Sequence, residues 1–309
     1  MAQLHEVPAN PTFMDCGTAY VTAMRPGWKN AKHADQWISS LETYAYPVLG
    51  ELPVDSIDIN LVLKVLEPIW IGKTETASRL RGRIEAILDY ARVRGYRSGE
   101  NPARWKGHLD HILPATGDVA KVRHHASLPY ARMPAFWPRL QAQHGLGARA
   151  LELCILTATR TGDVLGARWS EFDMDNRVWE IPGLRMKAGA DHRIPLSGPA
   201  LALLRKLAAI RRGDYVFPGQ QATRPLSNMS MAMVLRRMKL DVTPHGFRST
   251  FRTWIAEQTN FPHEVAEAAL AHTQGDKVVA AYQRGDLFAK RARLMDAWAV
   301  FCETGESPP

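Results

Sequence analysis

The sequence of 309 residues contains little cysteine. Cys16, Cys154 and Cys302 are odd in number and far apart, and no two of them have the spacing of metal ligands. This distribution argues against a disulfide framework and against a zinc site. Unpaired cysteines suit a reducing compartment, so we expect a cytoplasmic protein.

Long apolar runs are also missing. No stretch of about 18 apolar residues occurs, so we expect no membrane span. The first residues, MAQLHEVPANP, lack the basic segment and the apolar run of a signal peptide.

The sequence lacks the motifs of two common classes of protein that act on phosphates, the ATP-binding proteins and the two-metal nucleases. The pattern G-x-x-x-x-G-K-[ST] of ATP-binding loops is absent. There is also no dense cluster of Asp and Glu of the kind that two-metal nucleases use. The sequence therefore predicts neither a metal nor another cofactor.

Acidic side chains are fewer than basic ones. The chain carries 39 Lys and Arg against 31 Asp and Glu, a net charge of +8. Residues 1–125 hold 15 basic and 14 acidic side chains, whereas residues 126–309 hold 24 and 17. A basic excess favours polyanionic partners such as nucleic acid, and here it lies in the C-terminal part.

The first half of the chain is predicted to be helical. Between Thr74 and Arg94 apolar residues recur at helical spacing, and Gly95 is placed to end the helix. Five arginines lie mostly off this stripe. They form either a solvated face or, as we predict for Arg79 and Arg83, a row of contacts to DNA phosphates. The apolar residues are Leu80, Ile84, Ile87, Leu88 and Ala91.

A polar, turn-rich stretch divides the chain. We predict a helical domain over residues 10–112, a linker over 113–130 and a second domain over 131–309. Lys121 and Arg123 in the linker either follow a DNA backbone or are ordinary linker charge.

The second half mixes helices with short strands. Strands are predicted at 177–182 and 193–196, joined by a turn at MKAGAD, with another short strand at 215–217. The fold class is therefore mainly α with a small β-sheet. Helices are predicted at 133–143, 148–159, 199–212, 227–239, 245–258, 263–272 and 289–301.

Four segments of the second half hold residues suited to phosphate chemistry: TATRTGDVLGARWSEFD, LRMKAGADHRIPL, TPHGFRSTFRTW and LAHTQGDKVVAAYQR. Each has a plain structural interpretation when taken alone. Arg160 and Asp163 fit a helix start, where the dipole favours the acid. A lone tyrosine such as Tyr282 is more often an amphipathic packing residue than a nucleophile.

Taken in order, the set resembles the signature of the tyrosine recombinase family, in particular phage and genomic-island integrases. In that signature Gly and then an acidic residue follow the first arginine, and the lysine lies in a β-hairpin. A His-x-x-Arg opens a helix, and Leu-[Gly/Ala]-His precedes the tyrosine by about ten residues. Residues 10–112 are likewise similar to the family's helical core-binding domain. The matching positions are Arg160, Asp163, Lys187, His245, Arg248, His272 and Tyr282.

The resemblance implies cleavage and rejoining of DNA through a phosphotyrosine on Tyr282, without metal or ATP. Arg160 and Arg248 would clamp the phosphate, because a planar guanidinium bonds phosphate oxygens bidentately and stays charged. The tyrosine hydroxyl has an ordinary pKa near 10 and needs activation. His245 is the predicted base or hydrogen-bond partner.

The remaining roles follow the same pattern. Lys187 is the predicted acid for the departing 5′-oxygen, and His272 would donate to the phosphate. Asp163 would orient Arg160 or His245. As implied partners we expect double-stranded DNA with attachment sites, a homo-tetramer on that DNA and accessory DNA-bending proteins.

Several departures and alternatives stay open. Asp163 stands where the family more often has glutamate, and Arg185 lies close to Lys187 in the inferred hairpin. The family's small N-terminal arm-binding domain is not found, as in shorter members or in a truncated integrase that only binds DNA. A type IB topoisomerase would share the chemistry. The helix at 289–301 is expected either to dock onto a neighbouring subunit or to pack on its own domain.

Overall fold

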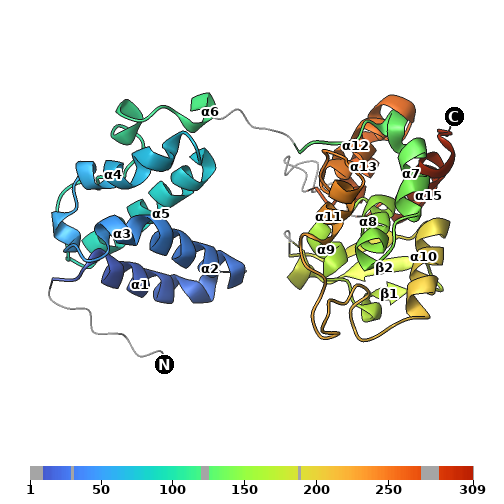
Figure 1. Cartoon of the computed structure of the whole chain (residues 1–309), viewed down its shortest axis with the longest axis horizontal. Helices are drawn as coiled ribbons and strands as arrows, with labels where there is room; N and C mark the ends of the chain where they lie inside the picture. Colours follow the sequence, from blue (N-terminus) through green and yellow to red (C-terminus); the bar gives the residue numbers. More distant parts are fainter. Residues whose placement is uncertain (1–9, 29–30, 120–124, 187–188, 273–284, 309) are drawn as a thin grey trace. The chain divides into compact units, whose positions relative to one another are not determined.

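The computed structural model describes residues 10–28, 31–119, 125–186, 189–272 and 285–308. The chain divides into two compact units, Met1–Arg123 and His124–Pro309, each of which is described by itself (Figure 1). Among the described residues no helix is long and apolar enough to cross a membrane.

The N-terminal unit is helical. Thr12 begins the first helix with a capping box, in which its hydroxyl accepts from the Asp15 N–H and the Asp15 carboxylate accepts from the Thr12 N–H. Asp58 caps a later helix through the Leu61 N–H. The helices are α1 Phe13–Met24, α2 Ala31–Ser40, α3 Tyr46–Leu49, α4 Ile59–Trp70, α5 Thr74–Val93 and α6 Thr116–Val119, with a π-helical turn over Leu41–Ala45.

Helix α5 is the centre of this unit and confirms the predicted helix. All five residues of its apolar stripe are fully buried, and α5 packs against α1 and α4. Gly95 follows with φ +78°, a left-handed conformation that ends the helix without a Cβ clash. The arginines around the stripe are not uniformly solvated, because Arg83 is 9% exposed. The expectation of a solvated face is therefore wrong for Arg83.

The stretch predicted as a linker is structured at both ends. Leu113 is buried in the N-terminal core, and the Trp70 indole N–H donates to the Pro114 carbonyl at 2.9 Å. At the other end Leu128 is buried in the C-terminal core. Lys121 and Arg123 lie outside the described residues.

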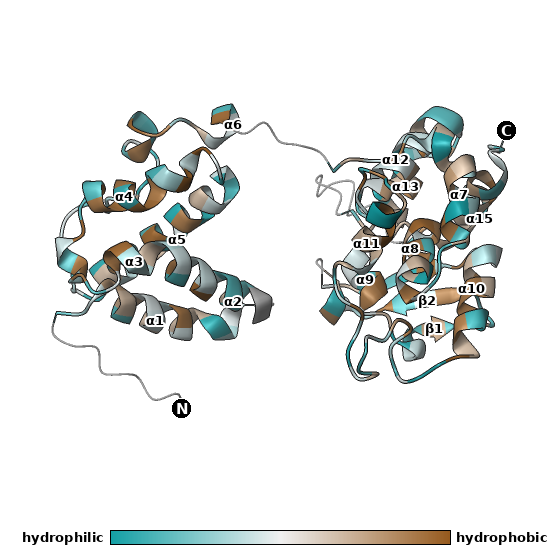
Figure 2. Cartoon of the chain, in the orientation of Figure 1, coloured by the Kyte–Doolittle hydropathy of each residue, from teal (hydrophilic) through white to brown (hydrophobic). Residues whose placement is uncertain are grey.

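The C-terminal unit surrounds helix α8, Leu146–Thr157, with helices on several sides. Every residue of α8 from Ala150 to Thr157 is buried and most are apolar, as expected of a central helix. The buried Glu152 forms an ion pair with Arg149 at 2.6 Å. Figure 2 shows apolar ribbon gathered toward the interior of the unit. The other helices are α7 Met133–Gln141, α9 Thr161–Leu165, α10 Gly198–Ala208, α11 Ser230–Arg237, α12 Gly246–Gln258, α13 His263–Ala269 and α15 Phe288–Thr304.

Each predicted helix of this unit is present, with ends that differ by a few residues, and the sheet is small and antiparallel in the order β1-β2-β3. Strand β2, Val178–Ile181, pairs with β3, His192–Pro195, so that Trp179 lies opposite Ile194. These strands confirm the two that were predicted and the fold class with them. The prediction missed β1, Phe172–Asp173, which is only two residues long. The strand predicted at 215–217 is wrong, since Tyr215 forms only an isolated bridge to Arg168.

Helix α15 packs on its own unit. Trp298 is fully buried beside Trp254 and Phe301, and its indole N–H donates to the Ile155 carbonyl of α8 at 2.9 Å. The 1% exposed Arg291 donates to the Arg193 carbonyl of β3 and to Asp286. Of the two expected placements, the structure therefore has packing on the same domain.

The chain enters the C-terminal unit against the start of α12. The Ala126 carbonyl accepts from the Thr243 N–H at 3.0 Å, and the Thr250 hydroxyl donates to the Leu128 carbonyl at 2.6 Å. Gly246, the first residue of α12, lies so close that an added Cβ would stand 2.1 Å from the Ala126 oxygen. Glycine at this position lets the two backbones touch.

We expect Gly246→Ala to destabilise the protein by about 1–3 kcal/mol, because the Cβ has only rigid backbone to displace. As a control, Gly82→Ala in the middle of α5 meets nothing within 4 Å and should stabilise by about 0.5–1 kcal/mol. Urea unfolding of both variants measures the difference. A Gly246→Ala protein as stable as the wild type would contradict the close approach.

Candidate active site

The first arginine of the signature stands in a tight connection between two helices. Helix α8 ends at Thr157, Ala158 follows with φ +50°, and Arg160 is the N-cap of α9. The Arg160 backbone is extended, and its carbonyl accepts from the Asp163 N–H at 2.9 Å. The predicted pair of Arg160 and Asp163 is thus fixed by the first turn of α9.

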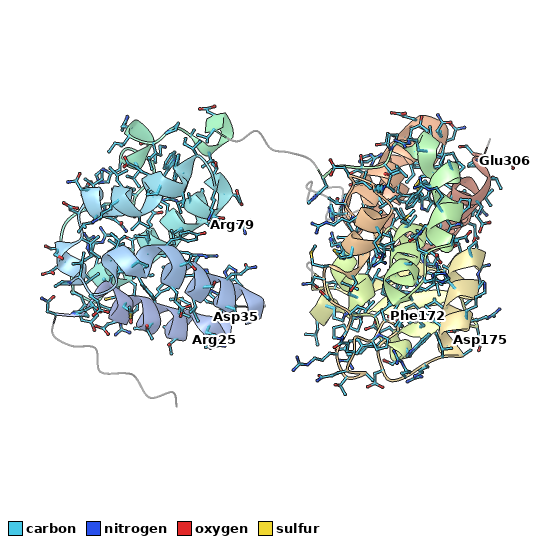
Figure 3. The ribbon with its side chains drawn as sticks, viewed as in Figure 1. Arg25, Asp35, Arg79, Phe172, Asp175 and Glu306 are labelled. Atoms are coloured by element: carbon cyan, nitrogen blue, oxygen red, sulfur yellow. The ribbon has the colours of Figure 1, made fainter. Side chains whose placement is uncertain are left out.

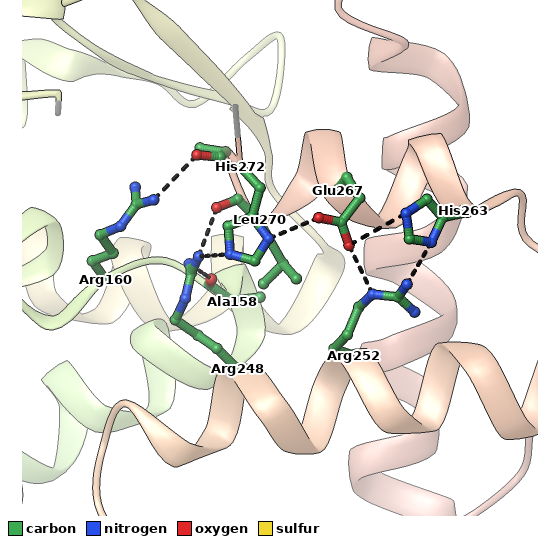
Figure 4. Close-up of polar contacts among 9 residues, drawn as sticks. Ala158, Arg160, Arg248, Arg252, His263, Glu267, Leu270 and His272 are labelled. Carbon is green, nitrogen blue, oxygen red and sulfur yellow. Dashed lines mark hydrogen bonds and ion pairs between the residues drawn. The ribbon is translucent and has the colours of Figure 1, made fainter. Parts of the chain in front are cut away.

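The second arginine, Arg248, projects from α12 into the unit and is only 6% exposed. Its guanidinium donates to the Ala158 carbonyl and, at 2.6 Å, to the Leu270 carbonyl (Figure 4). One of its nitrogens also lies 3.2 Å from His272 Nε2. Burial and the charge of Arg160 lower the Arg248 pKa to about 10, which leaves the group protonated at neutral pH.

The two arginines converge on the end of α13. Arg160 donates to the Ala271 carbonyl at 3.1 Å, one residue beyond the carbonyl that binds Arg248 (Figure 4). The next residue is His272. Two like charges held close by neighbouring carbonyls create a strongly positive site, which is suited to an anion.

Asp163 lies in the field of these arginines. Burial raises the pKa of its half-buried carboxyl, while Arg160, Arg185 and Arg248 oppose that shift. Arg185 donates to the Asp163 carbonyl at 2.5 Å and forms an ion pair with Glu171. The side chain of Arg185 is therefore occupied by contacts within the unit.

His245 stands at the N-cap of α12, with its side chain exposed. Its ring centroid lies 4.6 Å from that of His125. Although the residue is exposed overall, partial removal of the ring from water lowers the His245 pKa, and nearby His125, Arg248 and Arg160 add to this shift. A neutral imidazole at neutral pH has a lone pair that can take a proton.

Three of the six predicted catalytic residues, Arg160, Arg248 and His272, are therefore brought together by hydrogen bonds at the end of α13. His245 lies close enough for the charges of both arginines to lower its pKa. Lys187 and Tyr282 lie outside the described residues. Along the sequence, Tyr282 comes four residues before Asp286. The Asp286 carboxylate accepts a hydrogen bond from the Arg291 guanidinium of α15 at 3.1 Å.

Comparison with known proteins agrees with this geometry. Residues 13–108 match the phage integrase central domain, and residues 141–286 match the phage integrase family. The prophage integrase IntA of Escherichia coli (strain K12) is 30% identical over 300 residues, covering 91% of this chain and 69% of that protein. The chain belongs to the phage integrase family, whose members are tyrosine-type site-specific recombinases.

Other relatives also belong to the phage integrases. The integrase of Enterobacteria phage P4 is 31% identical over 288 residues, covering 86% of this chain and 64% of that protein. The chain thus spans about two thirds of the length of these curated relatives. Among solved structures, a lambda integrase dimer bound to a COC′ core site superposes with a TM-score of 0.66 at 18% identity, covering 85% of this chain and 96% of that one. This likeness confirms the fold of the present chain.

The predicted DNA-contact arginines of the integrase differ in their surroundings. Arg79, labelled in Figure 3, has a side chain 64% exposed that pairs with Glu75 at 2.8 Å. Arg83 instead donates to the Gln36 carbonyl at 2.7 Å and lies over the Trp37 ring. Both arginines line a groove of about 590 Å³ beside the hydroxyl groups of Ser39, Ser40, Thr43 and Thr76.

His192, the first residue of β3, was not among the predicted site residues. Burial lowers its pKa to about 4, with further contributions from Arg291, Arg160 and Arg248. A neutral histidine therefore lies within the electrostatic influence of Arg160 and Arg248. The one sequence signal for His192 is its position beside the predicted hairpin. The arginines that act on it, Arg160, Arg248 and Arg291, come from distant segments of the chain.

We expect His192 to make the integrase acid-sensitive. In the unfolded chain His192 binds a proton near pH 6.5, whereas in the folded protein it does so only near pH 4. The neutral ring therefore contributes fully to folding stability above pH 6.5, and this contribution is lost as the pH falls toward 4. Between pH 7 and 4.5 the wild type should lose roughly 2–3 kcal/mol more stability than His192→Gln. Urea unfolding followed by tryptophan fluorescence at each pH measures both proteins. Equal losses would contradict the shift.

Proposed function

We propose that this integrase cuts and rejoins double-stranded DNA at attachment sites by transferring a phosphodiester to Tyr282, and so integrates or excises a mobile element. The observation that carries the proposal is the convergence of Arg160 and Arg248 on the carbonyls of Leu270 and Ala271, directly beside His272. Cations fixed in advance lower the barrier to attack on an anionic phosphate, because they meet the charge that builds up on its oxygens.

The proposed step breaks one bond as it forms another. The Tyr282 oxygen attacks the phosphorus, the bond to the 5′-oxygen breaks, and a 3′-phosphotyrosine remains. His245 takes the tyrosyl proton, since its lowered pKa keeps the imidazole neutral, with a free lone pair, at neutral pH. Lys187 gives a proton to the departing 5′-oxygen. Arg160 and Arg248 bind the phosphate oxygens, and His272 donates a further hydrogen bond.

Asp163 has a supporting role in this proposal. Its carboxyl lies in the field of both clamp arginines and belongs to the same helix start as Arg160. An acid in this position keeps the Arg160 guanidinium oriented before DNA arrives.

The two units are proposed to divide the work. Residues 10–112 would form the core-binding domain, 113–130 the linker and 131–309 the catalytic domain. The groove beside Arg79 offers this cation and the hydroxyl groups of Ser39 and Thr76 as donors for DNA phosphates. The Ser40 and Thr43 hydroxyls already donate to backbone carbonyls, and Asp35 adds an acidic side chain to the lining. Lys121 and Arg123 would follow the backbone. Arg83 would reach DNA only with the part of its guanidinium that Gln36 and Ser40 leave free.

The working assembly is proposed to be a homo-tetramer on two DNA sites, assisted by accessory DNA-bending proteins. A lambda integrase tetramer bound to a Holliday junction superposes on this chain with a TM-score of 0.65 at 19% identity. The shared fold makes the same kind of assembly a reasonable expectation.

Replacing Tyr282 tests the nucleophile. Wild type and Tyr282→Phe are incubated with fragmented DNA from the source genome and denatured, and the DNA linked to protein is sequenced. We expect adducts at one sequence with the wild type and none with the variant, because phenylalanine has no oxygen to attack phosphorus. A gel shift with both proteins controls for binding.

Each other outcome has a defined meaning. Scattered adducts would favour a type IB topoisomerase. Adducts that persist in Tyr282→Phe would place the nucleophile elsewhere. Binding without any adduct would leave a protein that only binds DNA.

Replacing Lys187 tests the acid. Lys187→Ala should slow cleavage of ordinary DNA by about 10²–10⁴-fold, the usual contribution of general acid catalysis. With a site whose 5′-bridging oxygen is sulfur, the leaving group needs no proton and the variant should approach the wild-type rate. Failure of the sulfur substrate to restore cleavage would contradict the assignment.

A further inference from the structure

A chain of ionisable side chains leads away from the arginines on the far side of His272 (Figure 4). His272 Nδ1 lies 2.9 Å from one oxygen of Glu267. The other Glu267 oxygen accepts from Arg252 Nε at 2.8 Å, and Arg252 also contacts His263 Nδ1 at 2.5 Å. None of Glu267, Arg252 and His263 belongs to the signature positions.

The end of helix α13 builds the contact between Glu267 and His272. The His272 N–H donates to the Glu267 carbonyl at 3.0 Å, and the Ala271 N–H donates to the Ala268 carbonyl at 3.2 Å. Ala271 has φ +48°. This combination is a Schellman motif, which returns the residue five positions after Glu267 to the last turn of the helix. The backbone thus places His272 beside Glu267 before their side chains meet.

The charge and position of the Glu267 carboxylate suit it to accept a hydrogen bond from a protonated Nδ1 of His272. Burial pushes the pKa of its carboxyl up, but hydrogen bonds from His272 and Arg252 together bring it below the ordinary value. The carboxylate is therefore charged at neutral pH. It is also held in place, because Glu267 is about four-fifths buried and Arg252 binds its other oxygen.

The ring of His272 has two nitrogens with different surroundings. Nδ1 faces the Glu267 carboxylate, while Nε2 faces Arg248 at the phosphate site. A carboxylate at Nδ1 keeps the proton on that nitrogen and fixes the plane of the ring. While the ring is neutral, Nε2 can accept from the Arg248 N–H. A second proton would turn Nε2 into a donor, and a phosphate bound beside Arg248 would accept from it.

We propose that Glu267 is a positioning residue for strand cleavage: it fixes the orientation and the Nδ1 proton of His272, and it stabilises the imidazolium that donates from Nε2 to the phosphate. Arg252 holds Glu267 for this task. The inference rests on the proposed function, since it gives His272 a phosphate to bind.

The tautomer is tested first, because it can be observed without DNA. The full chain is labelled with ¹⁵N-histidine, and the His272 signals are identified by their loss in His272→Ala. We expect the proton of neutral His272 on Nδ1 in the wild type, and a shift toward Nε2 in Glu267→Ala. A wild-type His272 protonated on Nε2 would overturn the proposal, whatever the activity of the protein.

Cleavage is tested by a double-mutant cycle on a DNA duplex carrying the site recovered by adduct sequencing. Glu267→Gln should slow formation of the covalent adduct about 10–100-fold, the usual effect of removing a group that orients an active histidine. In a His272→Ala background the same substitution should change the rate less than about twofold, because the residue through which it acts is gone.

Controls separate positioning from folding. Glu264→Gln, one turn earlier on α13, should leave the rate unchanged, and gel shifts should show equal DNA binding for all variants. Equal slowing by Glu267→Gln with and without His272 would indicate a merely structural role and overturn the inference. A wild type that forms no adduct would overturn the proposed function, and with it the part of the inference that concerns cleavage.

Discussion

The active site depends on how one buried guanidinium is satisfied. A charged group taken out of water is stable only where acceptors surround it, and Arg248 finds two of them in the carbonyls of Ala158 and Leu270. One acceptor ends α8 and the other follows α13, so Arg248 joins two segments that are 112 residues apart in sequence. The same contacts leave Arg160 and His272 at its side. Arg248 therefore both connects two segments of the fold and supplies a cation to the candidate active site.

Much of this arrangement could be predicted from the sequence, because the relevant signals are local. The stripe on α5 and the extended runs of β2 and β3 follow from periodicity. The order of Arg160, His245, Arg248 and His272 is a pattern along the chain that needs no knowledge of contacts. The two-residue strand β1 carries no such pattern, and Tyr215–Phe217 looks extended although its partner offers only one bridge.

The parts that could not be predicted depend on tertiary neighbours. Arg83 looks like its exposed neighbours in sequence, but Gln36 and Trp37 come from another helix and bury it. The pKa of His192 is lowered first by burial and then by arginines from three other segments. Glu267 is an ordinary helical glutamate until the helix ends and the chain turns back on it. Lys187 and Tyr282 were found by resemblance, and the described residues place neither.

The three cysteines noted at the outset have a practical consequence. All are buried, and burial raises the pKa of Cys16 to about 11, that of Cys154 to about 12 and that of Cys302 well above its ordinary value. Because the thiolate is the form that reacts with alkylating reagents, the folded chain is close to chemically silent toward maleimides. A single cysteine introduced on the surface of each unit would then carry a fluorescent dye selectively. The sequence is thus suited to measuring, by energy transfer, whether the distance between dyes on the two units changes when DNA is added.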